Sequence, residues 1–165
     1  ILLHGEHKDM TDRQMTNQKR KRIMLIGRST AGKTTLCQRI FNEDIRYHKT
    51  QTVTVEHEVM IDTPGEYLER RGYRGALMVT SADADIILFL QDATENGTMY
   101  PAQFSTMFTK PCPGVVTKID IAGIKQINDA EVYLRAAGAQ KIYRISSVTG
   151  EGVDELLRAL DMPVD

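Results

Sequence analysis

Long apolar runs are missing from this sequence of 165 residues. The apolar stretches, such as Ile86 to Leu90, fall far short of the roughly 20 residues that a helix needs to cross a bilayer, so no membrane span is expected. An excess of either charge is missing too, since 22 acidic residues stand against 21 basic ones. A chain so balanced has no overall field to attract nucleic acid, and we expect no nucleic acid partner.

Cysteines and targeting signals are equally scarce. The two cysteines, Cys37 and Cys112, lie far apart in sequence and match no metal-ligand spacing. Reduced thiols in a cytoplasmic protein are the expected outcome. The amino terminus is polar and charged, unlike a secretory signal, and no internal repeat or low-complexity segment follows it.

The chain is predicted to form one folded domain. Its 41% apolar residues suffice for a single core, and a second full domain would not fit. Residues 1–20 are expected to be a disordered tail, in part upstream of a natural start at Met10 or Met15. Residues 21–162 are expected to hold the domain.

Within that domain, segments with strand and helix patterns alternate. Continuous apolar runs such as Ile23–Ile26 and Ile86–Leu90 are typical of strands buried on both faces, which parallel sheets require. The alternation predicts an α/β fold of three layers, a mostly parallel sheet with helices on both faces. The expected strands are Ile23–Ile26, Val53–Val55, Val59–Ile61, Ile86–Leu90, Gly114–Thr117 and Ile142–Ile145, and the expected helices are Lys33–Phe41, part of Tyr67–Thr80, Asn128–Ala137 and Val153–Leu160.

A phosphate-binding loop is predicted between the first strand and the first helix. Residues 27–34 read Gly-Arg-Ser-Thr-Ala-Gly-Lys-Thr and match G-x-x-x-x-G-K-[ST] in full. Glycines let successive backbone N–H groups point at phosphate oxygens, and the following helix adds its unpaired N–H groups. Lys33 would supply positive charge to the β- and γ-phosphates. The residues expected to contact the phosphates are Gly27, Ser29, Thr30, Ala31, Gly32, Lys33, Thr34 and Thr35.

A magnesium site is predicted beside this loop. The Thr34 hydroxyl is one expected ligand. Asp62, at the end of an apolar strand, is an acidic second ligand that is expected to hold the ion through water. From the loop between them, a threonine hydroxyl is expected to reach the metal, with Thr50 preferred and Thr52 as its rival. Gly65, which closes Asp-Thr-Pro-Gly, would bring its N–H close to a γ-phosphate.

A base-recognition motif is predicted after the strand 114–117. Ionised Asp120 carries two acceptor oxygens, which suit the adjacent N–H donors of guanine and face a lone pair on adenine. The aliphatic stem of Lys118 is expected to lie over the purine. The residues expected near the base are Thr117, Lys118, Asp120, Ser146, Ser147 and Val148.

Taken in order, these motifs resemble the Ras-like, translation-factor-type GTPases. More narrowly, Lys49-Thr50-Gln51 and Asp62-Thr63-Pro64-Gly65-Glu66-Tyr67 resemble the ethanolamine and propanediol utilisation family, EutP/PduV. The resemblance covers about residues 21–162. It implies Mg²⁺ and GTP or GDP as ligands, with ATP as a less favoured nucleotide. It also implies association with bacterial microcompartments, through a shell protein or an enzyme as partner.

Two positions depart from the wider pattern. Glu66 stands where many Ras-like enzymes carry a Gln that orients the attacking water, and a carboxylate there would repel the γ-phosphate. The last motif reads Ser-Ser-Val where Ser-Ala is commoner. Binding with slow hydrolysis is therefore predicted, with Lys33, Gly65 and Glu66 as the candidate catalytic residues.

Two other functions stay open. The first is an ATP-dependent kinase for a small molecule, for which the EutP/PduV resemblance implies a short-chain carboxylate such as acetate as the acceptor. The second is a structural adaptor that binds nucleotide with little turnover. The phosphate loop suits all three functions, whereas Asp120 favours guanine. The oligomeric state is left open. The arginines available to a kinase acceptor site are Arg28, Arg46, Arg70, Arg71 and Arg74.

Overall fold

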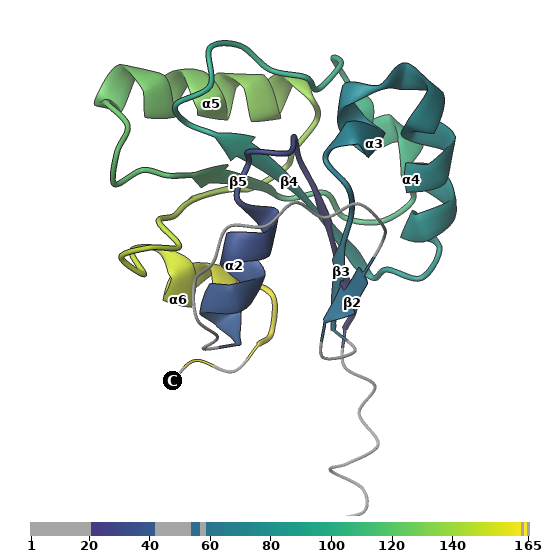
Figure 1. The fold of residues 1–165 in the computed structure, drawn as a ribbon, viewed down its shortest axis with the longest axis horizontal. Coiled ribbons are helices and arrows are strands. Elements are labelled where there is room, and N and C mark those ends of the chain that lie inside the picture. The colour runs from purple at the N-terminus through teal and green to yellow at the C-terminus, as the bar shows by residue number, and fades with distance from the viewer. Residues whose placement is uncertain (1–20, 42–53, 57–58, 163, 165) are drawn as a thin grey trace, which may run out of the picture.

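The structure, a computed structural model, describes residues 21–41, 54–56, 59–162 and 164 (Figure 1). One six-stranded sheet lies between two layers of helices. The strands are β1 (Ile23–Ile26), β2 (Thr54–Glu56), β3 (Met60–Asp62), β4 (Ile86–Asp92), β5 (Gly114–Thr117) and β6 (Ile142–Arg144). The helices are α2 (Lys33–Ile40), α3 (Glu66–Glu69), α4 (Arg74–Ser81), α5 (Ile124–Ala136) and α6 (Val153–Ala159), with 3₁₀ turns η1 (Arg71–Tyr73) and η2 (Phe104–Met107).

The sheet runs in the order β2-β3-β1-β4-β5-β6. Only β2 is antiparallel to its neighbour, and the other pairings are parallel, so the predicted mostly parallel sheet is confirmed. β1 lies between β3 and β4. The chain first connects β1 to the strands on one side of it, β2 and β3, and then crosses to β4 on the other side. Open α/β sheets bind ligands at such a switch point, beyond the carboxyl ends of the strands.

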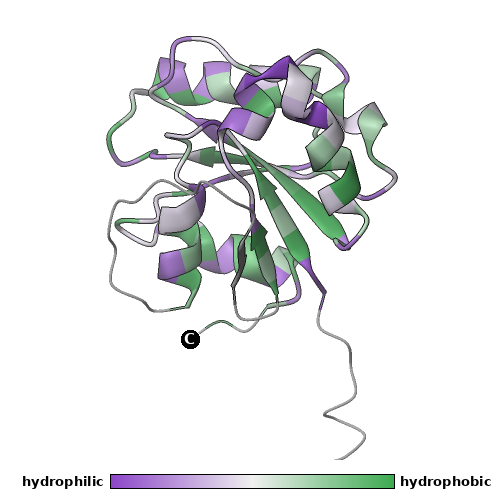
Figure 2. Cartoon of the chain, turned by 45° about the vertical axis from the view of Figure 1, so that its right-hand side comes forward, coloured by the Kyte–Doolittle hydropathy of each residue, from purple (hydrophilic) through white to green (hydrophobic). Residues whose placement is uncertain are grey.

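The side chains of β1 alternate between the two faces of the sheet, and each face carries its own core. Met24 and Ile26 pack toward α3, α4 and α5, whereas Ile23 and Leu25 pack toward α2 and α6. All four side chains are fully buried. The hydropathy colouring shows the same division, with apolar strands in the middle and polar outer faces on the helices (Figure 2). Fully apolar strands are therefore explained by two covered faces.

An aromatic cluster holds the long connection after β4 against one face. The rings of Phe89 and Tyr100 stack at 5.2 Å, and Phe104 lies 5.4 Å from both Phe89 and Phe108. The buried Tyr100 hydroxyl lies 2.9 Å from the carbonyl oxygens of Ile26 and, equally, of residue 90. Its proton serves one of them at a time: a bond to Ile26 anchors the end of β1, and a bond to Leu90 anchors β4.

Some boundaries differ from the sequence predictions. α5 begins at Ile124, four residues before the predicted Asn128, and its first turn contains the exposed Ile124 and the half-buried Ile127, which packs on the core. The Gln126 side chain accepts the Gly123 N–H at 2.8 Å and caps this turn. The helical signal over 67–80 splits into α3, η1 and α4, since Arg70 adopts an extended conformation. The proline-containing segment 101–113 holds no α-helix.

None of the helices in the described part of the chain has the length and apolar content that a bilayer crossing requires.

The two-faced core predicts a sharp contrast within α5. Leu134 is fully buried, and Leu134→Ala should lower the free energy of unfolding by about 2–5 kcal/mol through lost burial and a cavity. Val132, 61% exposed on the same helix, is the matched control, and Val132→Ala should change it by less than about 0.5 kcal/mol. Urea unfolding of the nucleotide-free protein measures both. Equal losses would contradict the assignment of the buried face.

Candidate functional site

The phosphate loop connects the carboxyl end of β1 to the first turn of α2. Gly32 has a φ of 89°, a left-handed conformation that only glycine adopts without strain. A Cβ on Gly27 would lie 2.9 Å from the Ala31 Cβ, so a side chain there would push the loop open. The Ala31 N–H donates to the Arg28 carbonyl at 2.9 Å and closes the turn.

The Lys33 ammonium lies folded into the loop. It donates to the carbonyl oxygens of Gly27 and Arg28 at 2.9 and 3.0 Å, and the residue is only 5% exposed. Burial lowers the pKa of Lys33, while the nearby carboxylates of Asp62 and Glu69 act to raise it. A buried cation at the mouth of a Gly-rich turn is what phosphate binding requires.

The two predicted magnesium ligands of the described chain lie together. The Thr34 hydroxyl donates to Asp62 Oδ2 at 2.9 Å, across the gap between α2 and the end of β3. A hydroxyl and a carboxylate are the hard oxygen donors that Mg²⁺ prefers, so these residues fit the ion. Within the described ranges no three His, Cys, Asp or Glu side chains gather as a metal site. Thr50 and Thr52 lie outside the described residues.

The segment after β3 packs directly on the phosphate loop. The Thr63 hydroxyl donates to the Leu25 carbonyl at 2.7 Å. A Cβ on Gly65 would lie 2.2 Å from the Ser29 nitrogen and 2.4 Å from its Cα. Only glycine fits this contact, a steric reason that the sequence did not reveal. The half-buried Glu66 follows as the first residue of α3.

The predicted base motif lies at the same carboxyl edge of the sheet as the phosphate loop. One cavity of about 190 Å³ is lined by Gly32, Thr35, Thr117, Lys118, Asp120, Ile121, Ser147 and Val148. Asp120 is exposed there, and Val148 is 62% exposed. The Thr117 hydroxyl donates to the Ala31 carbonyl at 2.7 Å and ties this motif to the phosphate loop.

Ser146 is the one predicted base contact that does not line the cavity. It is fully buried, and its hydroxyl oxygen accepts the Thr149 N–H at 3.1 Å. Its carbonyl accepts the Gly150 N–H at 2.8 Å. Ser146 therefore shapes the turn that presents its neighbours to the cavity.

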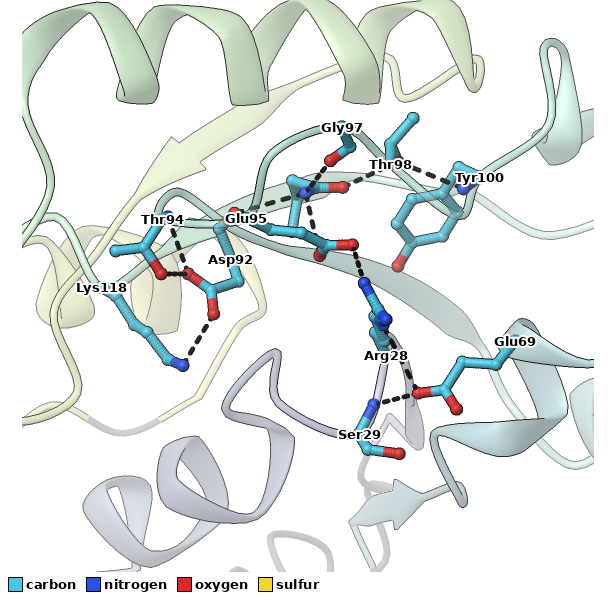
Figure 3. Close-up of polar contacts among 11 residues, drawn as sticks. Arg28, Ser29, Glu69, Asp92, Thr94, Glu95, Gly97, Thr98, Tyr100 and Lys118 are labelled. Atoms are coloured by element: carbon cyan, nitrogen blue, oxygen red, sulfur yellow. Dashed lines mark hydrogen bonds and ion pairs between the residues drawn. The ribbon is translucent and has the colours of Figure 1, made fainter.

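A buried carboxylate that the sequence analysis missed fixes Lys118. The Lys118 ammonium lies 2.7 Å from Asp92 Oδ2 at the end of β4, while Asp92 Oδ1 accepts the Thr94 N–H and hydroxyl at 2.8 and 2.6 Å (Figure 3). Lys118 has a φ of 63°, an uncommon conformation for a residue with a side chain. Asp92 follows a buried strand at the edge where the other motifs lie, and that placement was the available signal.

A second missed network surrounds Arg28. Its guanidinium lies 2.7 Å from Glu95, and the Ser29 N–H donates to Glu69 Oε1 at 2.9 Å (Figure 3). Burial acts to raise the pKa of Glu69, but the bonds from Ser29 and the charges of Arg28 and Lys33 outweigh it, and the pKa lies below its usual value. Glu69 is therefore an anion at neutral pH.

Comparison with known proteins identifies the family of this chain. The family model described as "Ethanolamine utilisation - propanediol utilisation" matches residues 20–162. The chain belongs to this family. It is 42% identical over 136 residues to the propanediol utilization protein PduV of Citrobacter freundii, an alignment that covers 82% of this chain and 90% of the relative. It is also 27% identical over 138 residues to the "probable acetate kinase EutP" of Escherichia coli K12, covering 83% and 87%.

Solved structures agree on the fold. Era of Aquifex aeolicus bound to GDP·AlF₄⁻ superposes with a TM-score of 0.60 at 21% identity, covering 90% of this chain and 58% of that one. Era bound to MgGDPNP and a piece of 16S ribosomal RNA gives 0.64 at 23% identity, covering 89% and 58%. The predicted Ras-like P-loop fold is thus confirmed, for a chain that spans little more than half of those proteins.

The Gly65 contact makes a testable prediction. Gly65→Ala should lower the free energy of unfolding by about 1–3 kcal/mol, since the new methyl group overlaps Ser29. Gly75 in α4 has nothing within 4 Å of its would-be Cβ, and Gly75→Ala should be neutral or stabilise by up to about 1 kcal/mol. Denaturant unfolding without nucleotide compares the two. If both variants behave alike, α3 does not pack on the loop as described.

Proposed function

We propose that this chain is a Mg²⁺-dependent GTP-binding protein with slow GTP hydrolysis. It would act as a nucleotide switch or accessory factor in ethanolamine or propanediol utilisation. The observation that carries the proposal is the shared cavity: Gly32 and Thr35 from the phosphate loop line it together with Lys118 and Asp120 from the base motif. One ligand with a base at one end and phosphates at the other fits this arrangement.

Guanine is the base that the cavity favours. The exposed Asp120 offers two acceptor oxygens, which match the ring N1–H and the exocyclic amino group of guanine. Adenine has an acceptor at N1, so the same carboxylate would face it lone pair to lone pair. Charge-assisted, bidentate bonds of this kind discriminate strongly between bases. The Lys118 stem, held at its end by Asp92, is positioned to cover a purine face.

The phosphates would bind where the loop is most positive. Lys33 would move its ammonium from the Gly27 and Arg28 carbonyls to phosphate oxygens, which regains solvation lost on burial. Thr34 and Asp62 would hold Mg²⁺, whose charge offsets that of the phosphates. The Gly65 N–H would face the terminal phosphate. These assignments rest on the donor types and on their common location.

Slow hydrolysis follows from Glu66. A carboxylate at the position that follows Gly65 repels a terminal phosphate and is a poor substitute for an amide that orients water. Fast turnover would need a partner protein or a rearranged site. Family membership supports a cytoplasmic protein that associates with a bacterial microcompartment, through its shell or an enclosed enzyme.

The second candidate function is an ATP-dependent kinase for a small carboxylate. Its support is the printed name of the Escherichia coli relative, together with Arg28, a second cation within the phosphate loop. The two candidates differ in the base that they use and in the acceptor of the phosphoryl group, water or acetate. Binding competition separates them before any assay of turnover.

The base assignment predicts the order of nucleotide displacement. A fluorescent GTP analogue on the wild-type protein should be displaced by GTP far more readily than by ATP. Asp120→Asn should weaken GTP binding by about 100-fold, the loss expected for two charge-assisted bonds, and shift the preference toward XTP. Asp129→Asn, on the exposed face of α5, is the control and should bind like wild type. Equal displacement by ATP would contradict the guanine assignment and favour the kinase.

The phosphate assignment predicts a loss for both bases. Lys33→Ala should abolish binding of GTP and ATP alike, a loss of at least about 100-fold for a buried charge that meets phosphate. Lys125→Ala, at an exposed position of α5, is the matched control. Unchanged affinity in Lys33→Ala would show that the loop does not bind the phosphates.

A further inference from the structure

A carboxylate from outside the phosphate loop binds one of the loop's backbone N–H groups. Glu69, the last residue of α3, accepts the Ser29 backbone N–H at 2.9 Å. That N–H belongs to the turn whose amides are expected to bind phosphate oxygens. A side chain from another element thus uses a donor that a ligand would need.

Positive charge surrounds the same carboxylate. Arg28 Nε lies 3.9 Å from the Glu69 oxygen that Ser29 binds, and the Lys33 ammonium is close enough to act on its charge. Arg28 is fixed from its other end by Glu95, which in turn accepts a bond from Gln91 Nε2 at 3.3 Å. A backbone amide and two cations form a donor set that fits any oxyanion, and Figure 3 shows Glu69 and Ser29 facing each other.

The position of this donor set identifies the oxyanion that it suits. Ser29 is in direct contact with Gly65, whose would-be Cβ lies 2.2 Å from the Ser29 nitrogen. Gly65 is the residue that would face the terminal phosphate, whereas the backbone amides at the start of α2 lie farther along the loop. The Glu69 carboxylate therefore lies at the corner of the site reached by a triphosphate but not by a diphosphate.

We propose that Glu69 is a tethered competitor for the terminal phosphate and sets the preference of the site between nucleoside di- and triphosphates. The inference rests on the proposed function and deepens it. Two anions cannot share the Ser29 N–H, so a triphosphate must expel the carboxylate, whereas a diphosphate leaves it in place. Because Leu68 is 1% exposed and anchors α3, the smallest change that clears the corner is a rotation of the Glu69 side chain.

Affinity ratios test the competition. The ratio of the GDP to the GTP dissociation constant is measured for wild type, Glu69→Gln and Glu69→Ala in excess Mg²⁺. Both variants should raise the ratio by about tenfold in favour of GTP, the effect of removing one charge-assisted bond that the triphosphate must otherwise break. Glu155→Gln, an identical change at an exposed position of α6, should leave the ratio within about twofold of wild type.

The Ser29 amide gives a readout that needs no nucleotide. In the free protein its N–H should exchange at least about tenfold faster with solvent in Glu69→Ala than in wild type, as expected when a bond to a charged group is lost. Glu155→Gln should leave the rate unchanged. Amide hydrogen exchange followed by NMR measures this, and circular dichroism checks that the variants fold.

The outcomes separate the two proposals. If wild type binds both nucleotides but the ratio is unchanged or falls in the Glu69 variants, the competitor role is wrong and the proposed function stands. If wild type binds neither nucleotide, the proposed function fails. Tripolyphosphate and pyrophosphate then replace GTP and GDP, and the competitor role survives only if Glu69→Gln improves tripolyphosphate binding selectively.

Discussion

A buried ammonium group organises the carboxyl edge of this sheet. Lys33 is removed from water at the turn from β1 into α2, and its charge is stabilised by two loop carbonyls and by the carboxylates of Asp62 and Glu69. These groups belong to the phosphate loop, β3 and α3, so the cation at the start of α2 attracts groups from three other segments. An oxyanion ligand would stabilise the Lys33 ammonium more than the carbonyl dipoles do, because it brings a full opposite charge.

The end of β4 connects the two halves of the site. Asp92 holds the Lys118 ammonium on the base side, while Glu95, three residues later, holds Arg28 on the phosphate side. The Thr117–Ala31 bond joins the same halves directly. A change in the phosphate loop therefore has short polar paths to the base motif. The Tyr100 ring stacks on Phe89, and its hydroxyl lies within hydrogen-bond distance of the Ile26 carbonyl at the end of β1.

The sequence predicted those features that depend on contiguous residues. β1 was predicted residue for residue, since four apolar side chains in a row need two covered faces, and the phosphate loop was located by its fixed spacing. Contacts between distant segments were not predictable: nothing in the local sequence links Glu69 to Ser29 or Asp92 to Lys118. The start of α5 was predicted four residues too late, because residues 124–126 are exposed and only Ile127 of the first turn packs on the core.

A crystal structure with GDP and Mg²⁺ tests most directly whether the Lys33 turn is the phosphate site. We expect phosphate oxygens against the Lys33 ammonium and the amides that begin α2, with the base in the cavity beside Asp120. A larger cavity of about 300 Å³ lies at the opposite, amino ends of the strands, beside Lys21, Pro113 and Tyr143. Nucleotide bound there, with Lys33 still on its own carbonyls, would contradict the account.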